Sequence, residues 1–219
     1  MQGPMEPNRE PREPFEVKIW TSSHGLAHHY FPQQLEKAYK HEGLLRFPEI
    51  DAVSGRVIDE QFVDIYREDF DKIKDSPNPR ISILLLGDNN IRQYALMGAF
   101  RVWKHTLEII ELHKGTCHPL LICGMMPSPQ TDAQTRPVSE YLDDRLKTKI
   151  NELRKQGRPA KIFGHFNSYS FFAEPEGYII ANKYFAPDGI HLNELGAYEL
   201  ASNMLLGAKI LAEVLLEYP

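Results

Sequence analysis

The segment Asp188-Gly-Ile-His191 holds an acid three residues before a histidine. At this spacing a carboxylate can reach one ring nitrogen of the imidazole while the other nitrogen faces a hydroxyl group. A histidine oriented in this way can act as a general base. The pair alone is a weak signal, because Asp188 is also well placed to begin the helix that follows.

Earlier in the sequence, three separate residues offer the groups that such a base would need. Ser23 follows a predicted strand, where its hydroxyl would project at the sheet edge and act as a nucleophile. Gly55 offers a backbone N–H with no Cβ in the way, and Asn89 offers a side-chain amide, so both could donate hydrogen bonds to an oxyanion. Each also has a common structural explanation, as a helix N-cap, a turn glycine or an Asx turn. Their joint occurrence, in the order and at the strand ends that one mechanism requires, points to a serine esterase.

The elements that would position these groups alternate between short apolar runs and longer stretches with helical periodicity. This alternation is typical of β-α units that build a parallel sheet. The predicted strands are Val17 to Thr21, Glu49 to Val53, Arg80 to Leu86, Pro119 to Cys123 and Ala160 to Phe163. The predicted helices are Gln61 to Ile73, Ile91 to His113, Ser139 to Gln156 and Glu194 to Glu217.

Right-handed crossovers between these units predict an α/β fold, a three-layer α/β/α sandwich around a five-stranded parallel sheet. In such sheets, ligands bind at the carboxyl ends of the strands. This rule places Ser23, Gly55 and Asn89 at one edge of the sheet. His165 ends the fifth predicted strand and is expected at the rim of the same pocket.

Composition narrows the class of protein. The chain has 219 residues, a net charge of −5 and 42% hydrophobic residues, which fits one domain with a sizeable core and argues against a generally basic nucleic-acid binder. Cys117 and Cys123 form no C-x-x-C motif and are expected to be buried and reduced. Since no run approaches about 18 apolar residues and no signal peptide is evident, the sequence predicts a protein without a transmembrane segment, in the cytoplasm.

The first sixteen residues, Met1 to Glu16, hold four prolines and four glutamates and little to bury. Such a composition predicts a disordered leader. The run Gln2-Gly-Pro-Met5 also matches the remnant of a cleaved tag, which would make the chain a domain taken from a longer polypeptide.

Taken together, the motifs resemble those of the SGNH (GDSL) hydrolase superfamily, whose four blocks carry serine, glycine, asparagine and histidine in that order. The matching residues are Ser23 within Thr21-Ser-Ser-His24, Gly55, Asn89 within Gly87-Asp-Asn-Asn90, and His191 within Asp188-Gly-Ile-His191. The resemblance covers residues 17–219 and implies a flavodoxin-like hydrolase domain. It also implies an acyl-enzyme mechanism with Ser23, His191 and Asp188 as the triad, and with Ser23, Gly55 and Asn89 as the oxyanion hole. No metal or organic cofactor is expected.

The first and third blocks depart from the usual pattern. Thr21 and Ser22 replace the usual Gly-Asp, which leaves Ser22 as a competing nucleophile, and Asn90 replaces an aspartate. The resemblance implies a small ester or lipid-like substrate with a short, acetyl-like acyl group. An aromatic run before the last block could form an apolar wall of the pocket or could pack in the core; it comprises Phe166, Tyr169, Phe171, Phe172 and Tyr184.

Two other functions are compatible with the sequence. His24 and His28 have helical i, i+4 spacing with His29 adjacent, but no third zinc ligand is evident, so surface histidines are the favoured interpretation. The basic residues Arg145, Lys147 and Lys149, followed by Arg154, Lys155 and Arg158, could contact RNA or a protein partner. A weak or inactive binding module, as in transposon-type polyproteins, is therefore the alternative, although nucleic-acid binding is not favoured because acids are interspersed.

Overall fold

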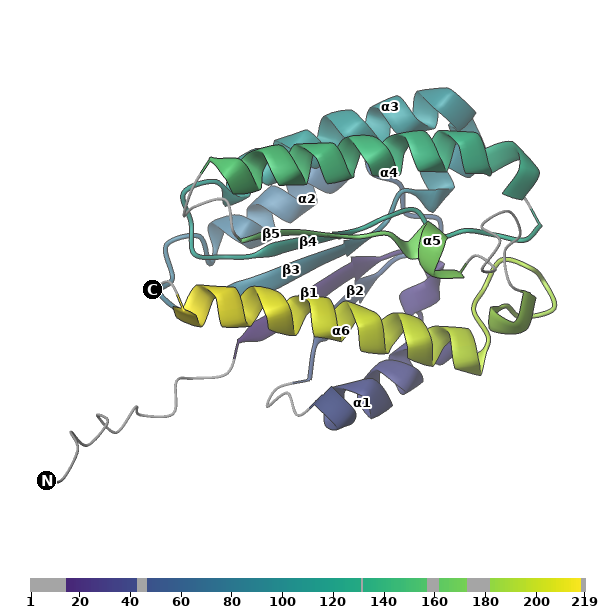
Figure 1. The fold of residues 1–219 in the computed structure, drawn as a ribbon, viewed down its shortest axis with the longest axis horizontal. Coiled ribbons are helices and arrows are strands. Elements are labelled where there is room, and N and C mark those ends of the chain that lie inside the picture. Colours follow the sequence, from purple (N-terminus) through teal and green to yellow (C-terminus); the bar gives the residue numbers. More distant parts are fainter. Residues whose placement is uncertain (1–14, 43–46, 131, 157–161, 173–181, 218–219) are drawn as a thin grey trace, which may run out of the picture.

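A computed structural model describes residues 15–42, 47–130, 132–156, 162–172 and 182–217 (Figure 1). Its strands are β1 (Glu16–Thr21), β2 (Glu49–Ala52), β3 (Arg80–Leu85), β4 (Leu120–Cys123) and β5 (Phe163–Phe166). Its helices are α1 (Tyr30–Glu42), α2 (Glu60–Asp71), α3 (Asp88–His113), α4 (Asp132–Lys155), α5 (Ser168–Phe172) and α6 (Glu194–Glu217). Short 3₁₀ helices lie at Ser23–Gly25 and Asn182–Tyr184.

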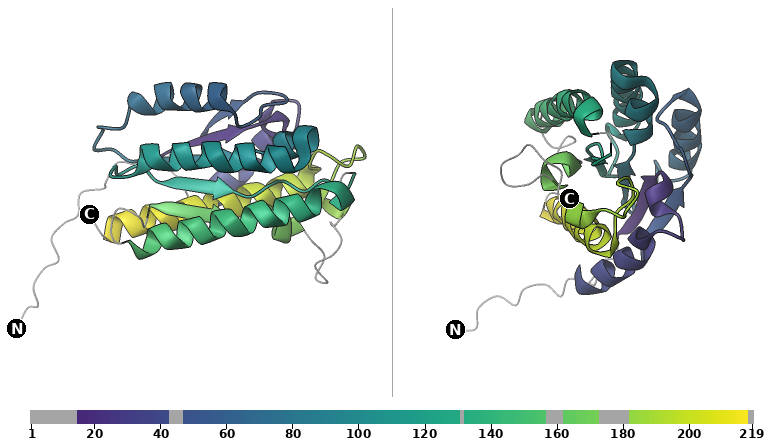
Figure 2. Two further views of the ribbon diagram at one scale, coloured as in Figure 1. Left: turned by 90° about the horizontal axis from the view of Figure 1, so that it is seen from above. Right: turned by 90° about the vertical axis from the view of Figure 1, so that its right-hand side faces the viewer.

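All paired strands run parallel, in the order β2-β1-β3-β4-β5. Helices α1 and α6 cover one face of the sheet, and α2, α3 and α4 cover the other (Figures 1 and 2). The predicted three-layer α/β/α sandwich with a five-stranded parallel sheet is confirmed, and its strand order is that of flavodoxin-like folds.

The central strand β3 explains why both faces need helices. Along a strand, successive side chains point to opposite faces. Ile81, Ile83 and Leu85 pack into the core shared with α1 and α6, whereas Leu84 and the adjoining Leu86 pack against the other three helices. A strand that is apolar on both faces is stable only when both faces are covered.

The first four strands lie within one residue of their predicted bounds, but the fifth does not. The prediction of Ala160 to Phe163 is wrong in position: β5 spans Phe163–Phe166, and Ala160 lies outside the described residues. Pairing with β4 sets this register, because Leu120 lies opposite Phe163 and Cys123 opposite Phe166. His165 is consequently inside the strand and not beyond its end.

Helices α3 and α4 begin earlier than predicted. Helix α3 starts at Asp88 and α4 at Asp132, upstream of the predicted Ile91 and Ser139. Pro137, a poor helix former, lies in the second turn of α4 and obscures its start in the sequence. A helix is expected after the first strand without stated bounds; α1 is that helix, and its buried Phe31, Leu35 and Ala38 follow helical i, i+4, i+7 spacing.

The described part of the chain begins at Phe15, inside the segment predicted as a leader. Phe15 packs against the core and Glu16 begins β1, while residues 1–14 lie outside the described part of the chain. Within the described residues, no helix is both long enough and apolar enough to cross a bilayer.

Helix α3 contains a sharp kink at Ala95. This residue has φ 46° and ψ −125°, and it is the one non-glycine residue with positive φ among those described. Just beyond the kink, Gly98 packs so closely on the Asn90 carbonyl that a Cβ would lie 2.0 Å from its oxygen. Holding Ala95 in this region costs on the order of 1–3 kcal/mol, so the surrounding structure must enforce the bend.

Candidate active site

Ser23, His191 and Asp188 form a continuous hydrogen-bonded series at the carboxyl end of β1. Nε2 of His191 lies 3.1 Å from Oγ of Ser23, and Nδ1 of His191 lies 2.7 Å from Oδ2 of Asp188. Ser23 and His191 are 168 residues apart in the chain. The tautomer with the proton on Nδ1 donates to Asp188 and leaves Nε2 free to accept the serine proton.

The carboxylate of Asp188 is fixed by more than the imidazole. Its Oδ1 accepts hydrogen bonds from the backbone N–H groups of Ile190 and His191, each at 2.9 Å. Partial burial would raise the pKa of Asp188, but the His191 ring and these two N–H groups outweigh it and hold that pKa well below its usual range. Asp188 is therefore ionised at neutral pH, although its side chain is about half exposed.

The loop that carries Asp188 and His191 is tied to two neighbouring segments. Gly189 has φ +62°, a conformation that favours glycine, and its carbonyl oxygen accepts a 2.8 Å hydrogen bond from Oγ of Ser128, after β4. On the other side, Asn193 donates to the carbonyl of Lys183 and accepts from the N–H of Gly196, at the start of α6. These contacts orient the imidazole from outside the triad, and the spacing of the motif gave no hint of Ser128.

The two adjacent serines occupy different environments. Ser22 is fully buried, and its hydroxyl has no hydrogen-bond partner among the described residues. Ser23 is partly exposed, and its hydroxyl is the one that faces His191. The geometry thus separates the two candidate nucleophiles that the sequence left open.

Two further histidine rings contact the imidazole of His191. The ring of His29 stacks on it at 4.0 Å between centroids, and the ring of His24 meets it edge-on at 5.4 Å. Burial lowers the pKa of His24 to about 4, against the opposing charge of Asp88, so His24 is neutral at pH 7. His24 lies in a 3₁₀ helix that ends at Gly25, so the expected helical spacing to His28 is wrong. In the described residues, no three His, Cys, Asp or Glu side chains are grouped for a metal ion.

Gly55 lies on the loop after β2, and Asn89 lies in the first turn of α3. Gly55 has φ +70° and open space where a Cβ would lie. The Asn89 amide donates one hydrogen bond, at 3.0 Å, to the carbonyl of Arg56, whose guanidinium approaches the Thr21 carbonyl. An amide nitrogen carries two hydrogens, so the second remains for another acceptor.

Asn90, at the position where the resemblance has an aspartate, is a buried structural residue. Its Oδ1 accepts from the N–H of Ile58 at 2.8 Å, and its Nδ2 donates to the carbonyl of the same residue at 2.9 Å. A carboxylate could not make the second bond, because it has no hydrogen to donate. The asparagine therefore fastens the loop before α2 to the start of α3.

The aromatic run before the last block packs in the core and does not stand as a separate wall. Phe172 is fully buried in the core under α6, and Phe166, Phe171 and Tyr184 pack against that core. The side chain of Tyr169 lies outside the described residues.

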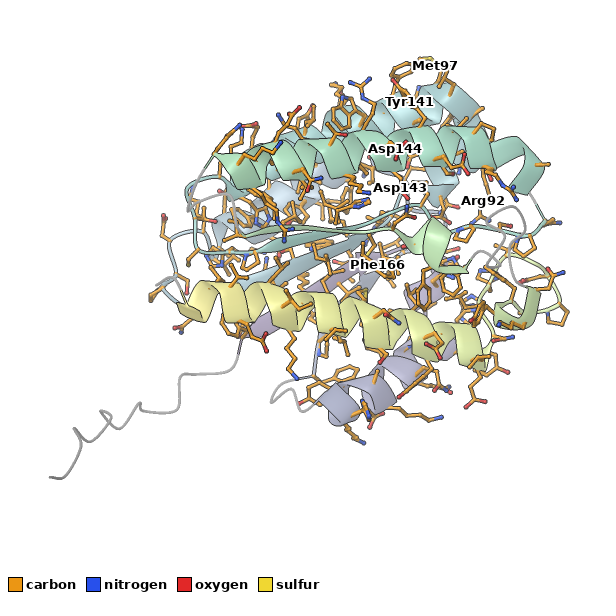
Figure 3. The ribbon with its side chains drawn as sticks, in the orientation of Figure 1. Arg92, Met97, Tyr141, Asp143, Asp144 and Phe166 are labelled. Carbon is orange, nitrogen blue, oxygen red and sulfur yellow. The ribbon has the colours of Figure 1, made fainter. Side chains whose placement is uncertain are left out.

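A second aspartate–histidine pair lies between α4 and the sheet. Nε2 of His165 lies 3.1 Å from Oδ1 of Asp143, and both side chains are almost fully buried. Figure 3 shows Asp143 on the side of α4 that faces the strands. Burial raises the pKa of Asp143, although His165 lowers it in part. His165, expected at the pocket rim, is thus engaged in packing α4 against β5.

The basic residues of α4 do not form one stripe. At about 100° per residue, Arg145 and Lys149 lie on one side of the helix, whereas Lys147 is about 200° from Arg145. Arg145 lies 4.6 Å from the Trp103 ring of α3. A phosphate backbone could not contact all three cations along one straight line.

Solved structures share this fold across nearly the whole chain, whereas no protein-family model and no curated protein matches the sequence. A GDSL-like lipase from Bacteroides thetaiotaomicron is 12% identical, with a TM-score of 0.61 over 90% of this chain and 88% of that one. A lipolytic G-D-S-L protein from Veillonella parvula is 18% identical, with a TM-score of 0.61 over 88% and 96%. A family 3 carbohydrate esterase from Clostridium thermocellum is 16% identical, with a TM-score of 0.61 over 91% and 98%. The resemblance to SGNH hydrolases is confirmed at the level of the fold.

Proposed function

We propose that this chain is a serine ester hydrolase of the SGNH type, with residues 17–219 as its catalytic domain. The observation that carries the proposal is the unbroken hydrogen-bonded series from Asp188 through His191 to Ser23. A fold shared with lipases and esterases supports it, because the series lies at the strand ends where such folds bind their ligands.

The proposed reaction proceeds through an acyl-enzyme. Nε2 of His191 takes the proton of Ser23 as Oγ attacks the ester carbonyl carbon, and it then gives that proton to the leaving alcohol. His191 then takes a proton from water as the water oxygen attacks the acyl-enzyme. It returns that proton to Oγ of Ser23 as the acid is released. Asp188 keeps the proton of the imidazole on Nδ1 and stabilises the imidazolium that forms.

The oxyanion of each tetrahedral intermediate needs donors near Ser23. We assign this role to the backbone N–H groups of Ser23 and Gly55 and to the second N–H of the Asn89 amide. Gly55 adopts the left-handed backbone that favours glycine, and the space beside its Cα is open. The bond to the Arg56 carbonyl holds the Asn89 amide in one orientation, as preorganised stabilisation requires.

The space beside the catalytic loop is small. A small cavity adjoins the catalytic loop, since Ser128 both lines it and donates to Gly189. It is also lined by Asp88, Arg92 and Met126 and has about 10 Å³ of room, close to that of one water-sized group. We propose acetyl-like esters as substrates, since the similar structures include an acetyl xylan esterase and the space beside the loop leaves little room for a long acyl chain.

Hydrolysis of p-nitrophenyl acetate tests the proposal. Ser23→Ala and His191→Ala should each lower kcat by about 10⁴-fold, because either change removes a member of a unit that acts together. A fluorophosphonate should label Ser23 and lose its target in Ser23→Ala. Turnover should fall as the acyl chain is lengthened from acetate to octanoate.

The neighbouring serine provides a matched control. Ser22→Ala removes a buried hydroxyl that has no partner among the described residues, so it should retain both turnover and labelling. Labelling at Ser22, or turnover that neither Ser23→Ala nor His191→Ala reduces, would exclude the assignment.

A further inference from the structure

The start of α3 exposes an apolar surface that the proposed reaction does not use. Tyr94, Leu96, Met97 and Phe100 all have exposed side chains, and Met97 reaches 61%. Residues 93 to 97 are exposed in succession, which is unusual for a helix because one side should face the core. We call these four side chains the α3 apolar patch.

The kink at Ala95 is what presents this patch. Its strained backbone ends the first turns of α3, and Gly98 then brings the rest of the helix back onto Asn90. The bend turns Leu96 and Met97 outward while Ala99 and Val102 remain buried. Backbone strain kept at an exposed apolar site indicates a function there, because strain tends to cluster at binding and switch regions.

The charged residues that follow the patch on α3, before Glu108, are the cations Arg101 and Lys104. Arg92, on the preceding turns, is paired with the buried carboxylate of Asp88. The guanidinium of Arg101 lies 4.5 Å from the centre of the Tyr94 ring, at the border of the patch. The ammonium group of Lys104 pairs with the carboxylates of Glu60 and Glu108 at the surface, where ion pairs contribute little to stability. An apolar surface bordered by cations complements a layer that is apolar inside and negative outside.

We propose that the α3 apolar patch docks on an anionic lipid surface. Leu96, Met97 and Phe100 would enter the boundary between headgroups and acyl chains, while Arg101 would lie at the level of the phosphates. Tyr94 would lie at the interface, where aromatic rings with a polar group accumulate. Figure 3 shows Met97 on the outer side of α3, pointing away from the strands, where a lipid surface could reach it.

Other occupants fit these observations less well. A symmetric contact between two copies would bring Arg101 and Lys104 of both chains toward one another around the same patch, which is repulsive. An RNA strand could bind the cations through its phosphates, but Leu96 and Met97 would make no favourable contact with it, because aliphatic side chains do not bind phosphates. An anionic lipid surface would contact both the apolar side chains of the patch and the cations beside it.

Vesicle binding by the full chain tests the proposal. Flotation with vesicles of phosphatidylcholine containing about 30% phosphatidylserine should recover the wild-type protein, and pure phosphatidylcholine should recover less. The double variant Leu96→Ser/Met97→Ser should partition at least about tenfold more weakly, since two apolar side chains no longer enter the interface. Arg101→Gln should weaken binding to the anionic vesicles by about fivefold, with a smaller effect on neutral ones.

Helix α6 supplies a matched control on the opposite layer. Leu206 and Ile210 are 45% and 48% exposed, close to the values in the patch, so Leu206→Ser/Ile210→Ser removes similar side chains elsewhere. This variant should float as the wild type does. Equal loss in both double variants would overturn the proposal, as would wild-type protein that does not bind anionic vesicles. Dimerisation abolished by Leu96→Ser/Met97→Ser, without vesicle binding, would instead identify an interface between copies and also overturn it.

Hydrolysis of soluble p-nitrophenyl acetate, measured on the same preparations, separates this inference from the esterase proposal. Neither double variant changes a residue of the proposed catalytic machinery, so both should hydrolyse the soluble ester at the wild-type rate. Vesicle binding without hydrolysis would leave the docking surface in place and refute only the esterase.

Discussion

Two aspartate–histidine pairs are hydrogen bonded in the structure, and within the described residues only the Asp188–His191 pair faces a serine. The Asp188–His191 contact is 2.7 Å and the Asp143–His165 contact is 3.1 Å, so both pairs are hydrogen bonded. Side-chain exposure separates them, at 48% and 22% for the first pair but 3% and 7% for the second. The exposed Asp188–His191 pair is therefore placed to react with a substrate, whereas the buried Asp143–His165 pair stabilises the packing of α4 on β5.

The environments of the two carboxylates explain this contrast. Backbone N–H groups and an imidazole surround Asp188 and lower its pKa, so a charged acceptor stays available to the histidine. Burial raises the pKa of Asp143, and its Oδ2 has no hydrogen-bond partner among the described residues. Gly124 leaves the room for this side chain, because a Cβ there would lie 2.2 Å from Oδ1 of Asp143. An acid beside a histidine thus supports catalysis only where a nucleophile and open space complete the arrangement.

The largest expected difference between the pairs is in turnover. Asp188→Asn should lower kcat for p-nitrophenyl acetate by about 10³-fold, because the amide no longer holds the proton of His191 on Nδ1. Asp143→Asn should leave kcat within about twofold of the wild type, since its partner His165 does not contact the serine. Active-site titration corrects both values for the folded fraction. A comparable fall in correctly folded Asp143→Asn would show that the buried pair takes part in the reaction.

For stability, the larger effect is expected at the buried Asp143–His165 pair and the smaller effect at the Asp188–His191 pair. Asp143→Ala leaves His165 buried without its partner and should lower the free energy of unfolding by about 2–4 kcal/mol. Asp188→Ala should change it by less than about 1 kcal/mol, because an exposed pair is screened by solvent. Urea unfolding followed by circular dichroism at pH 7 measures both. If Asp188→Ala were the more destabilising change, the assignment of packing to one pair and chemistry to the other would be wrong.

The smallest predicted effect is on the pH dependence of stability, to which the two aspartates should contribute with opposite signs. The pKa of Asp188 is lowered in the folded state, so its contribution to stability is present above its unfolded pKa of about 4 and is lost as pH falls through the folded value. The pKa of Asp143 is raised, so the folded state binds the proton more tightly and stability declines as pH rises from about 4 through the folded value.

The corresponding asparagine variants isolate the two contributions. Relative to the wild type, Asp143→Asn should gain stability as pH rises above about 4, whereas Asp188→Asn should lose stability as pH rises through the range below it. Urea midpoints between about pH 3 and pH 7 provide the comparison. Slopes of the same sign for the two variants would contradict the pKa directions on which this prediction depends.

Much of the fold was predictable because strand signals are local. The apolar runs at β1 and β3 have few alternatives to a buried strand, and helices α2, α3, α4 and α6 followed from apolar periodicity. The prediction failed where pairing, and not composition, sets the position of an element. Strand β5 contains Gly164 and His165, which are weak strand formers, and takes its register from β4.

Within the candidate site, the contact between Asp188 and His191 was predictable from their spacing. Three residues apart, a carboxylate can accept the backbone N–H groups of its own turn and reach the nearby ring, whatever lies around it. The identity of the partner serine was not predictable in this way. Ser22 and Ser23 are chemically alike, and only the direction in which each leaves the end of β1 places one under His191 and buries the other.

The spacing of a few residues therefore specified an acid, a base and the edge of the sheet on which they lie, because those features depend on local hydrogen bonds and on strand order. Packing between distant segments specified the rest. It stacked His29 on His191, tied Ser128 to the catalytic loop, buried Asp143 with His165 and exposed Met97 beyond the kink at Ala95. Such contacts depend on where whole helices come to rest on the sheet, and their positions follow from the packing of the complete core.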